Sequence, residues 1–395
     1  MSRQQIDRNA DLRRLRDEGF EIEVRSGLLL VHSVPYVTPR REVALGVLVS
    51  ELTMAAPDQL DKPGTHQIHF VGEHPCKPDG AELVQIRNSS GTFALADGVV
   101  ANHYFSHKPR SGAYADYYEK VTTYVRVISD QARAIDPTAD ARTFRTVESV
   151  SPESVFLYED TASSRAGVRQ LASTLGAHAV AIVGLGGTGA YVLDLIAKTH
   201  VREIHLFDGD VLRQHNAFRV PGAISRAALD KRQNKAAFWA EVYGAMRRGV
   251  VPHEMMITES NAHELSGFDT VFLCVDKGTA RQAVFAALAQ HKVVMIDAGM
   301  GVQLSDDGRT LVGICRVTTS TPETRECALA SVPSVDRADD LYGSNIQIAD
   351  LNCLNATMAV IRWKRRVGFY WDARSEVTST FTVASNLLAN TEATV

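Results

Sequence analysis

One stretch of the chain combines glycines at a spacing that suits phosphate binding. An apolar run at 179–183 continues into Gly184, Gly186, Gly187 and Gly189. The run predicts a buried strand, and the periodic apolar residues after it predict a helix. A strand, a glycine turn and a helix in this order bring backbone N–H groups and a helix N-terminus close to a phosphate. The pattern therefore predicts a nucleotide site, although a glycine cluster alone could be a purely structural turn.

Polar residues downstream favour the nucleotide interpretation. A second predicted strand, 204–207, is followed by Asp208, where a ribose-binding carboxylate is expected. Taken singly, an aspartate here could be a cap or a turn residue, and a lysine or arginine could be a surface charge. Order and spacing favour a functional set, which continues with Asp210, Asn216, Arg219, Lys235 and Asp276.

This ordered set resembles the ThiF/MoeB/ubiquitin-activating enzyme superfamily, over about residues 160–385. The resemblance implies ATP and Mg²⁺ as ligands, with the four glycines shaping the ATP loop. It also implies that Asp208 accepts hydrogen bonds from the ribose hydroxyls, and that Arg219 and Lys235 neutralise the triphosphate.

The remaining roles come from the same resemblance. Asn216 would hold a phosphate or orient the neighbouring arginine, and Asp276 would hold Mg²⁺. Asp210 would help with the metal or order the loop. Members of the family also use an arginine ahead of the first strand to reach the partner protomer's site; Arg165 is the candidate here and Arg169 the reserve.

The chemistry implied is activation of a carboxylate in two steps. Attack of a C-terminal carboxylate on the α-phosphate of ATP gives an acyl adenylate and releases pyrophosphate, a step that depends on positioning and charge neutralisation. A thioester then requires a cysteine. Cys327 follows the polar run 318–326 and is the predicted nucleophile, with an inert loop cysteine as the alternative. Arg325 would lower its pKa and Glu326 would oppose that effect.

The resemblance implies a homodimeric activating enzyme that passes a ubiquitin-like protein to a conjugating protein. The whole chain looks like the activating enzyme of a bacterial Bil-type ubiquitin-like conjugation (antiphage) system. Activation of a sulfur-carrier protein is the alternative, weakened because no C-x-x-C pair is present. An NAD-dependent Rossmann enzyme and an inactive nucleotide-binding scaffold are further alternatives. Neither alternative explains why Arg219, Lys235 and Asp276 are all present. Lys277 stands where the family often has Asn.

The pattern of predicted helices and strands differs between the two parts of the chain. Residues 146–395 alternate strands and helices, which predicts a Rossmann-like, mostly parallel sheet with helices on both faces and antiparallel C-terminal strands. Residues 1–145 predict a separate α+β domain of unassigned role, with partner docking as the hypothesis. Two local predictions within these regions are a helix over 43–54 and a frayed polar tail from Asn386.

Composition excludes several other classes. A net charge of −4 on 395 residues argues against a general nucleic-acid binder. No apolar window is long enough to span a membrane. Five cysteines form no disulfide framework, which favours a reducing cytoplasm. A zinc site at His66, His69, His74 and Cys76 is conceivable, but ordinary strand and turn residues are the favoured interpretation.

Overall fold

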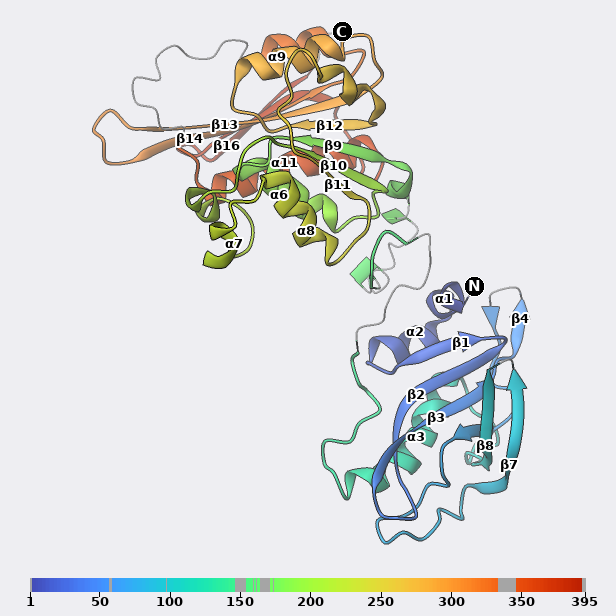
Figure 1. The fold of residues 1–395 in the computed structure, drawn as a ribbon. Coiled ribbons are helices and arrows are strands. Elements are labelled where there is room, and N and C mark those ends of the chain that lie inside the picture. Colours follow the sequence, from blue (N-terminus) through green and yellow to red (C-terminus); the bar gives the residue numbers. More distant parts are fainter. Residues whose placement is uncertain are drawn as a thin grey trace. The chain divides into compact units, whose positions relative to one another are not determined.

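The chain folds into two compact units, residues 1–147 and 148–395 (Figure 1). The structure, a computed structural model, describes residues 2–56, 59–96, 98–145, 154–158, 160, 162–163, 171–172, 174–332 and 346–392. Within these ranges no helix is both long and apolar enough to cross a bilayer.

The N-terminal unit is an antiparallel sheet with helices packed on one face. The helices are α1 (Ser2–Arg8), α2 (Ala10–Asp17) and α3 (Tyr117–Arg133). The sheet order is β1 (Ile22–Arg25), β2 (Leu28–Val37), β3 (Val43–Glu51), β6 (Gln67–Val71), β8 (Val99–Ser106) and β7 (Arg87–Ala96). A small hairpin adds β4 (Met54–Ala56) and β5 (Gln59–Leu60). Asp116 caps α3 by accepting a hydrogen bond from the backbone N–H of Glu119.

The predicted helix over residues 43–54 is wrong, because residues 43–51 form strand β3. This strand pairs antiparallel with β2 on one side and β6 on the other. Its apolar residues include the β-branched Val43, Val47 and Val49, which suit a pleated surface. A short apolar run cannot be assigned by periodicity alone, and here the pairing partners decide it.

The C-terminal unit contains an eight-stranded sheet. Its order is β11 (Val250–His253), β10 (Glu203–Phe207), β9 (Ala179–Val183), β12 (Thr270–Leu273), β13 (Val294–Leu304), β14 (Leu311–Ser320), β15 (Glu376–Thr382) and β16 (Leu387–Glu392). The strands from β11 to β13 are parallel, and those from β13 to β16 are antiparallel. The predicted fold class is therefore confirmed. The predicted frayed tail is wrong, because residues 387–392 pair with β15.

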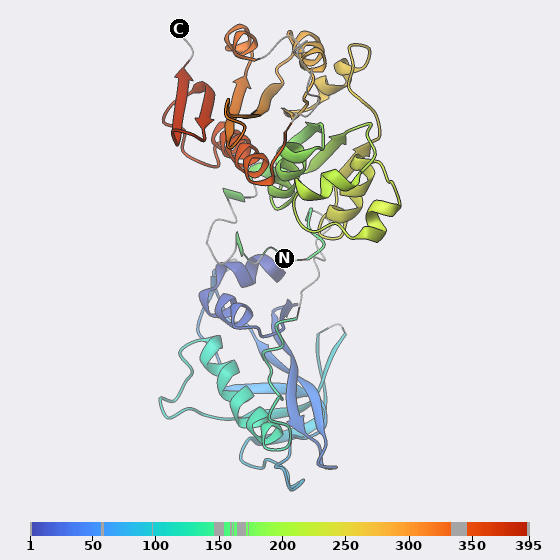
Figure 2. The same cartoon turned by 90° about the vertical axis from the view of Figure 1, so that its left-hand side faces the viewer.

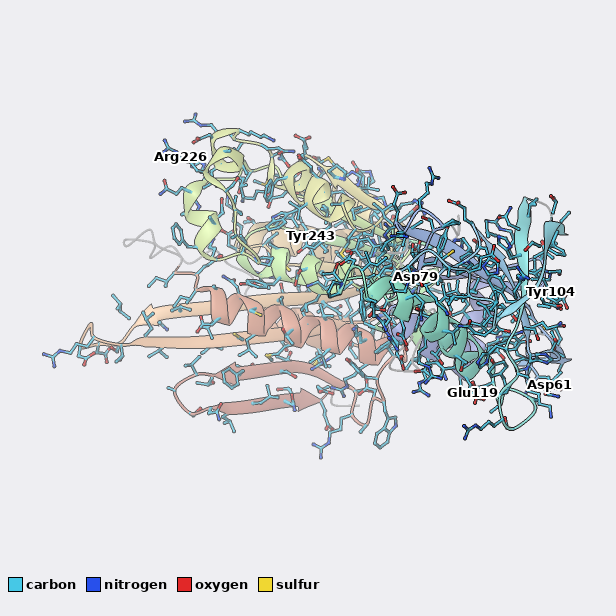
Figure 3. All side chains as sticks on the ribbon, turned by 90° about the horizontal axis from the view of Figure 1, so that it is seen from below. Asp61, Asp79, Tyr104, Glu119, Arg226 and Tyr243 are labelled. Atoms are coloured by element: carbon cyan, nitrogen blue, oxygen red, sulfur yellow. The ribbon has the colours of Figure 1, made fainter. Side chains whose placement is uncertain are left out.

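Helices cover both faces of this sheet (Figures 1 and 2). On one face, α6 (Gly187–Ala197), α8 (Lys235–Gly244) and α11 (Ala349–Arg366) contribute to a single buried cluster. On the other face, α9 (Gly278–Ala287), α10 (Arg325–Ser331) and the short helix η3 (Ala262–Gly267) contribute to a second. Tyr243 of α8, labelled in Figure 3, donates a hydrogen bond to Asp194 of α6 at 2.8 Å, which fixes the two helices together.

The strand order identifies the edge of the sheet at which ligands bind in folds of this kind. From the central strand β9 the chain moves outward to β10 and β11, and it then returns to β12 on the opposite side of β9. In open α/β sheets of this kind, ligands bind at the carboxyl ends of the strands where the order reverses. The glycine turn follows β9, and Asp276 follows β12, so both lie at this point.

Candidate nucleotide-binding site

The glycine turn leaves β9 in a shape that only glycine allows. Gly184 has a φ of +88°, and a Cβ there would lie 2.7 Å from the carbonyl oxygen of Cys274. A Cβ at Gly189 would collide with the carbonyl oxygen of Gly184, well under 3.0 Å away. At Gly186, by contrast, a Cβ would meet no described atom within 4 Å. The turn is therefore tightly packed on its protein side and open at Gly186.

The first turn of α6 rests on a buried asparagine that the sequence did not reveal. Asn352 of α11 is 1% exposed, and its side-chain oxygen accepts a hydrogen bond from the Thr188 hydroxyl at 2.9 Å. The same amide fills the space next to Gly187. Asn352 thus fixes the start of the helix whose N-terminus faces the predicted phosphate position.

Asp208 ties the glycine turn to the end of β10. Its carboxylate accepts hydrogen bonds from the backbone N–H groups of Leu185 at 2.7 Å and Asp210 at 2.8 Å. Burial raises the pKa of Asp208, while Lys235 and the two N–H groups act in the opposite direction. In this structure the carboxylate organises the turn. The ribose contact that the resemblance implies would use its remaining lone pairs.

Lys235 lies beside the two aspartates. Its Nζ is 2.8 Å from an Asp210 carboxylate oxygen and 3.7 Å from Asp208. The preceding residue, Asn234, caps α8 and donates a hydrogen bond to the Asp208 carbonyl oxygen. The lysine is only 6% exposed, and its charge is paired with the exposed Asp210 at the carboxyl edge of the sheet. An anionic ligand at this edge could take the place of Asp210.

Three buried donors near this edge have no partner in the described part of the chain, and one of them is the Nδ2 of Asn352 beside Gly187. Asn216, 2% exposed, accepts a hydrogen bond from the Arg213 backbone N–H, but its Nδ2 is unpartnered. The Nε of Arg219 is likewise buried and unpartnered. Burial lowers the pKa of Arg219, and the charge of Asp276 partly offsets this effect. The structure therefore brings Arg219 and Asp276 within electrostatic range of each other.

Asp276 itself lies exposed on the turn after β12, and a buried ion network braces this turn. Arg281 donates to the Val275 carbonyl oxygen at 2.7 Å and to the Asp297 carboxylate at 2.5 Å. The second oxygen of Asp297 binds Arg316 at 2.6 Å. Asp297 is 0% exposed, so the network forms a rigid support that positions the Asp276 turn. None of these three supporting residues was predicted from the sequence.

The structure does not bring Cys327 to this edge. Since β14 is antiparallel, its last residue, Ser320, pairs with Met295 near the start of β13. The following helix, α10, therefore begins at the amino edge, where Arg325 donates to the carbonyl oxygens of His291 and Val293. Cys327 is half-buried on this helix, not in a polar loop as predicted.

The other predicted features differ in accessibility. Burial raises the pKa of the thiols of Cys76, Cys274 and Cys315, the last to about 11, whereas Cys353 is exposed. Arg165 and Arg169 lie outside the described residues. In the histidine-rich segment, Cys76 donates to the His74 carbonyl oxygen, and no group of three potential ligands in the described ranges could hold a metal.

The fold and the site define the class: a Rossmann-like domain with a nucleotide-type glycine turn at its switch point. Residues 159–366 match the ThiF family, and the chain belongs to this family. The resemblance to the ThiF/MoeB/ubiquitin-activating enzyme superfamily is thus confirmed. Residues 10–161 match a domain of unknown function, DUF6791.

Individual relatives are more distant. Ubiquitin-like modifier-activating enzyme 5 of Drosophila virilis is 27% identical over 135 residues, which is 31% of this chain and 33% of that protein. The chain thus spans about a third of this curated relative. A crystal structure of E. coli MccB with ATP is 18% identical with a TM-score of 0.45, covering 56% of this chain and 65% of that one. E. coli TcdA with AMP is 17% identical with a TM-score of 0.40, covering 52% and 92%.

Proposed function

We propose that this protein adenylates the C-terminal carboxylate of a ubiquitin-like protein. The observation that carries the proposal is the carboxyl edge of the sheet. There, a glycine turn open at Gly186 lies at the same edge as the buried, unpartnered donors of Asn216 and Arg219. Buried donors are normally satisfied, so unpartnered ones at a ligand-binding edge fit a missing acceptor such as a phosphate oxygen. The ThiF family assignment supports the same chemistry.

In the proposed reaction, a carboxylate oxygen of the protein substrate attacks the α-phosphorus of ATP. The bond to the bridging oxygen breaks, and pyrophosphate leaves with its electron pair. Lys235 would exchange its contact with Asp210 for the phosphates, and Arg219 would donate to them. Asp276 would hold Mg²⁺, which neutralises phosphate charge when bound. The N–H groups at the start of α6 would orient the phosphate chain.

For the second step we propose transfer of the acyl group to Cys327. The thiolate would attack the acyl carbon, the carbon–oxygen bond to AMP would break, and AMP would leave. Because Cys327 lies at the amino edge and the adenylation residues at the carboxyl edge, α10 must leave its place for this step. The helix is short, with seven residues, and its N-cap residue, Thr324, makes no side-chain capping bond. Its movement would break the Arg325 bonds to His291 and Val293 and expose the buried Ala328, so substrate binding would have to offset these losses.

The wider setting is also proposed rather than observed. The name of the Drosophila relative supports a ubiquitin-like substrate. We propose a cytoplasmic homodimer, with Arg165 completing the partner's site, that hands its substrate to a conjugating protein in antiphage defence. Activation of a sulfur carrier remains the alternative substrate class. Incubation with each class of protein in an exchange assay separates them.

Thermal unfolding with ATP or NAD⁺ tests the nucleotide assignment. ATP at a hundred times its Kd should stabilise the C-terminal unit by about 2.7 kcal/mol, and NAD⁺ should not. Arg219→Ala should abolish most of the ATP effect, whereas Arg226→Ala should not, since that side chain projects into solvent from α7 (Arg226–Asp230; Figure 3). Equal protection by NAD⁺ would remove the basis for adenylation.

A further inference from the structure

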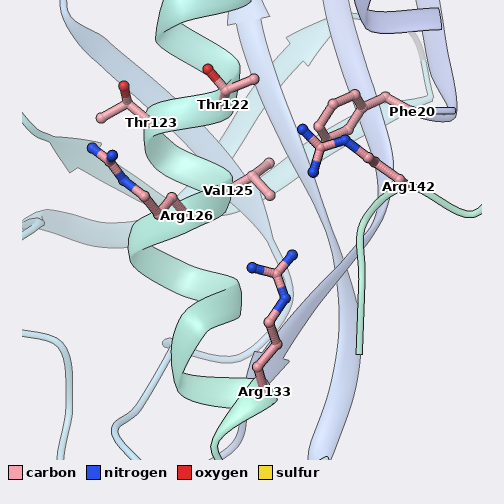
Figure 4. Close-up of a pocket in the computed structure, with 7 residues that line it drawn as sticks. All are labelled: Phe20, Thr122, Thr123, Val125, Arg126, Arg133 and Arg142. Carbon is pink, nitrogen blue, oxygen red and sulfur yellow. The ribbon is translucent and has the colours of Figure 1, made fainter. Parts of the chain in front are cut away.

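A polar cavity lies in the N-terminal unit, remote in sequence from the candidate nucleotide site. It has a volume of about 240 Å³ and opens beside α3 (Figure 4). Its lining contains three arginines and no acidic residue, and it consists of Phe20, Thr122, Thr123, Val125, Arg126, Arg133 and Arg142. A concave surface with three guanidinium groups and no carboxylate in its lining is suited to an anion.

Two of the arginines are held in place by the protein. Arg133 pairs with Asp130 at 3.0 Å and Asp140 at 3.3 Å, and its Nε donates to the Ala139 carbonyl oxygen. Arg142 pairs with Glu18 at 3.1 Å, and its guanidinium lies 4.9 Å from the centre of the Phe20 ring. A guanidinium has five N–H donors, so these contacts fix each group and leave donors for a ligand.

Arg126 supplies the charge that the protein does not compensate. In the described ranges no carboxylate oxygen lies within 4.0 Å of this exposed arginine, in contrast to Arg133 and Arg142, so it adds a positive charge at the cavity wall. The Thr123 hydroxyl lies one turn before it on α3 (Figure 4). Figure 4 shows the Arg126 side chain projecting from α3 away from Arg142, so this exposed side chain would turn toward the cavity to join the two fixed arginines around a doubly charged tetrahedral anion.

We propose that this cavity binds the phosphate group of a small ligand. Its volume lies below the range of about 300–1,000 Å³ for drug-sized ligands, so it accommodates a head group rather than a whole nucleotide. The Phe20 ring is only 3% exposed and is covered by Arg142, so it offers no face on which a base could stack. Recognition therefore depends on the phosphate, whether it comes from free phosphate or from a mononucleotide.

Calorimetric titration of the full chain tests this proposal. The protein should carry Arg219→Ala, so that phosphate binding at the nucleotide site of the other unit is weakened. Inorganic phosphate and AMP should both bind, and adenosine should not. Similar affinities for phosphate and AMP indicate free phosphate as the source, whereas tighter AMP binding indicates a mononucleotide, and both support the phosphate site.

Variants then locate the binding. Arg126→Gln should weaken phosphate binding about tenfold, the loss expected for one charge-assisted hydrogen bond, without changing the fold. Arg226→Gln is the control, because it removes an exposed arginine from the other unit. The absence of phosphate binding, adenosine binding that Arg126→Gln weakens, or an unchanged phosphate affinity in Arg126→Gln would each overturn the proposal. This outcome is independent of adenylation, so the two proposals can fail separately.

Discussion

The contact between Gly187 and Asn352 allows a sharp test of how the phosphate turn is built. A Cβ at Gly187 would lie closer than 3.0 Å to three atoms of the Asn352 side chain, namely Nδ2, Cγ and Oδ1. Because Asn352 is buried and bonded to Thr188, it cannot swing aside. Gly187→Ala should therefore destabilise the C-terminal unit by about 1–3 kcal/mol, the usual cost of overpacking.

Gly187→Ala and Asn352→Ala form a double-mutant cycle, in which Asn352→Ala removes the side chain that the new Cβ would meet. Asn352→Ala loses the hydrogen bond to Thr188 and should cost about 1 kcal/mol. In the double variant the added methyl group occupies the space of the deleted amide, so the two costs should not add. We expect a coupling free energy of about 1–2 kcal/mol that favours the double variant.

Gly189→Ala is the matched control, because its Cβ would meet the backbone carbonyl of Gly184. Asn352→Ala does not remove the clash between this Cβ and the Gly184 carbonyl. The pair Gly189→Ala and Asn352→Ala should therefore show no favourable coupling free energy. Chemical denaturation of all five variants measures the free energies of unfolding. Additive effects of Gly187→Ala and Asn352→Ala would refute the packing argument, as would equal rescue of Gly189→Ala.

Two further predictions concern buried charges. Burial lowers the pKa of Lys120 from 10.5 to about 8, so the unfolded chain binds more protons between these values and the stability of the N-terminal unit should rise with pH across that window. Lys120→Met should abolish this rise. It should also stabilise the unit at pH 7 by about 2 kcal/mol, because it removes the cost of burying the charge, about 3 kcal/mol, and loses only about 1 kcal/mol from the hydrogen bond to Ser50. Asp297→Asn leaves Arg281 and Arg316 without their carboxylate, so it should destabilise the C-terminal unit by about 3–5 kcal/mol and reduce adenylation in an exchange assay.

Exposed residues of the same type serve as controls for these two variants. Lys62→Met should leave the pH dependence unchanged, and Asp306→Asn should leave stability within about 0.5 kcal/mol of wild type. A pH dependence that survives in Lys120→Met would show that another group titrates. A fully stable and active Asp297→Asn would show that the Asp276 turn needs no ionic support.

Local patterns were enough to predict the elements that begin the parallel sheet of the C-terminal unit. The strand 179–183, the glycine turn and the helix after it are encoded within one short stretch, so pattern and structure agree. Residues 43–51 were misjudged because their strand character depends on pairing with β2 and β6. The polar residues 387–392 form an edge strand through pairing with β15, which no local pattern reveals.

The candidate site likewise contains residues that the sequence predicts and residues that only the fold brings together. Its glycines and the residues from Asp208 to Asp276 follow one another in a recognisable order, whereas Asn352 and the Arg281–Asp297–Arg316 network are assembled from distant segments. The position of Cys327 depends on the direction of β14, which reverses the course of the chain before α10. Sequence order alone could not place this thiol at the opposite edge of the sheet.

Pyrophosphate exchange combined with detection of a thioester separates the two proposed steps, adenylation of the substrate and its transfer to Cys327. With a ubiquitin-like substrate and ATP, the wild type should catalyse exchange and form an adduct that a thiol reductant removes. Asp276→Ala should do neither, and Cys327→Ala should exchange normally without forming the adduct. Cys353→Ser is the control, because Cys353 is the exposed cysteine of the described ranges. Retention of exchange in Asp276→Ala would contradict the proposed adenylation. Loss of exchange in Cys327→Ala, or an adduct that still forms in this variant, would contradict the proposed role of Cys327.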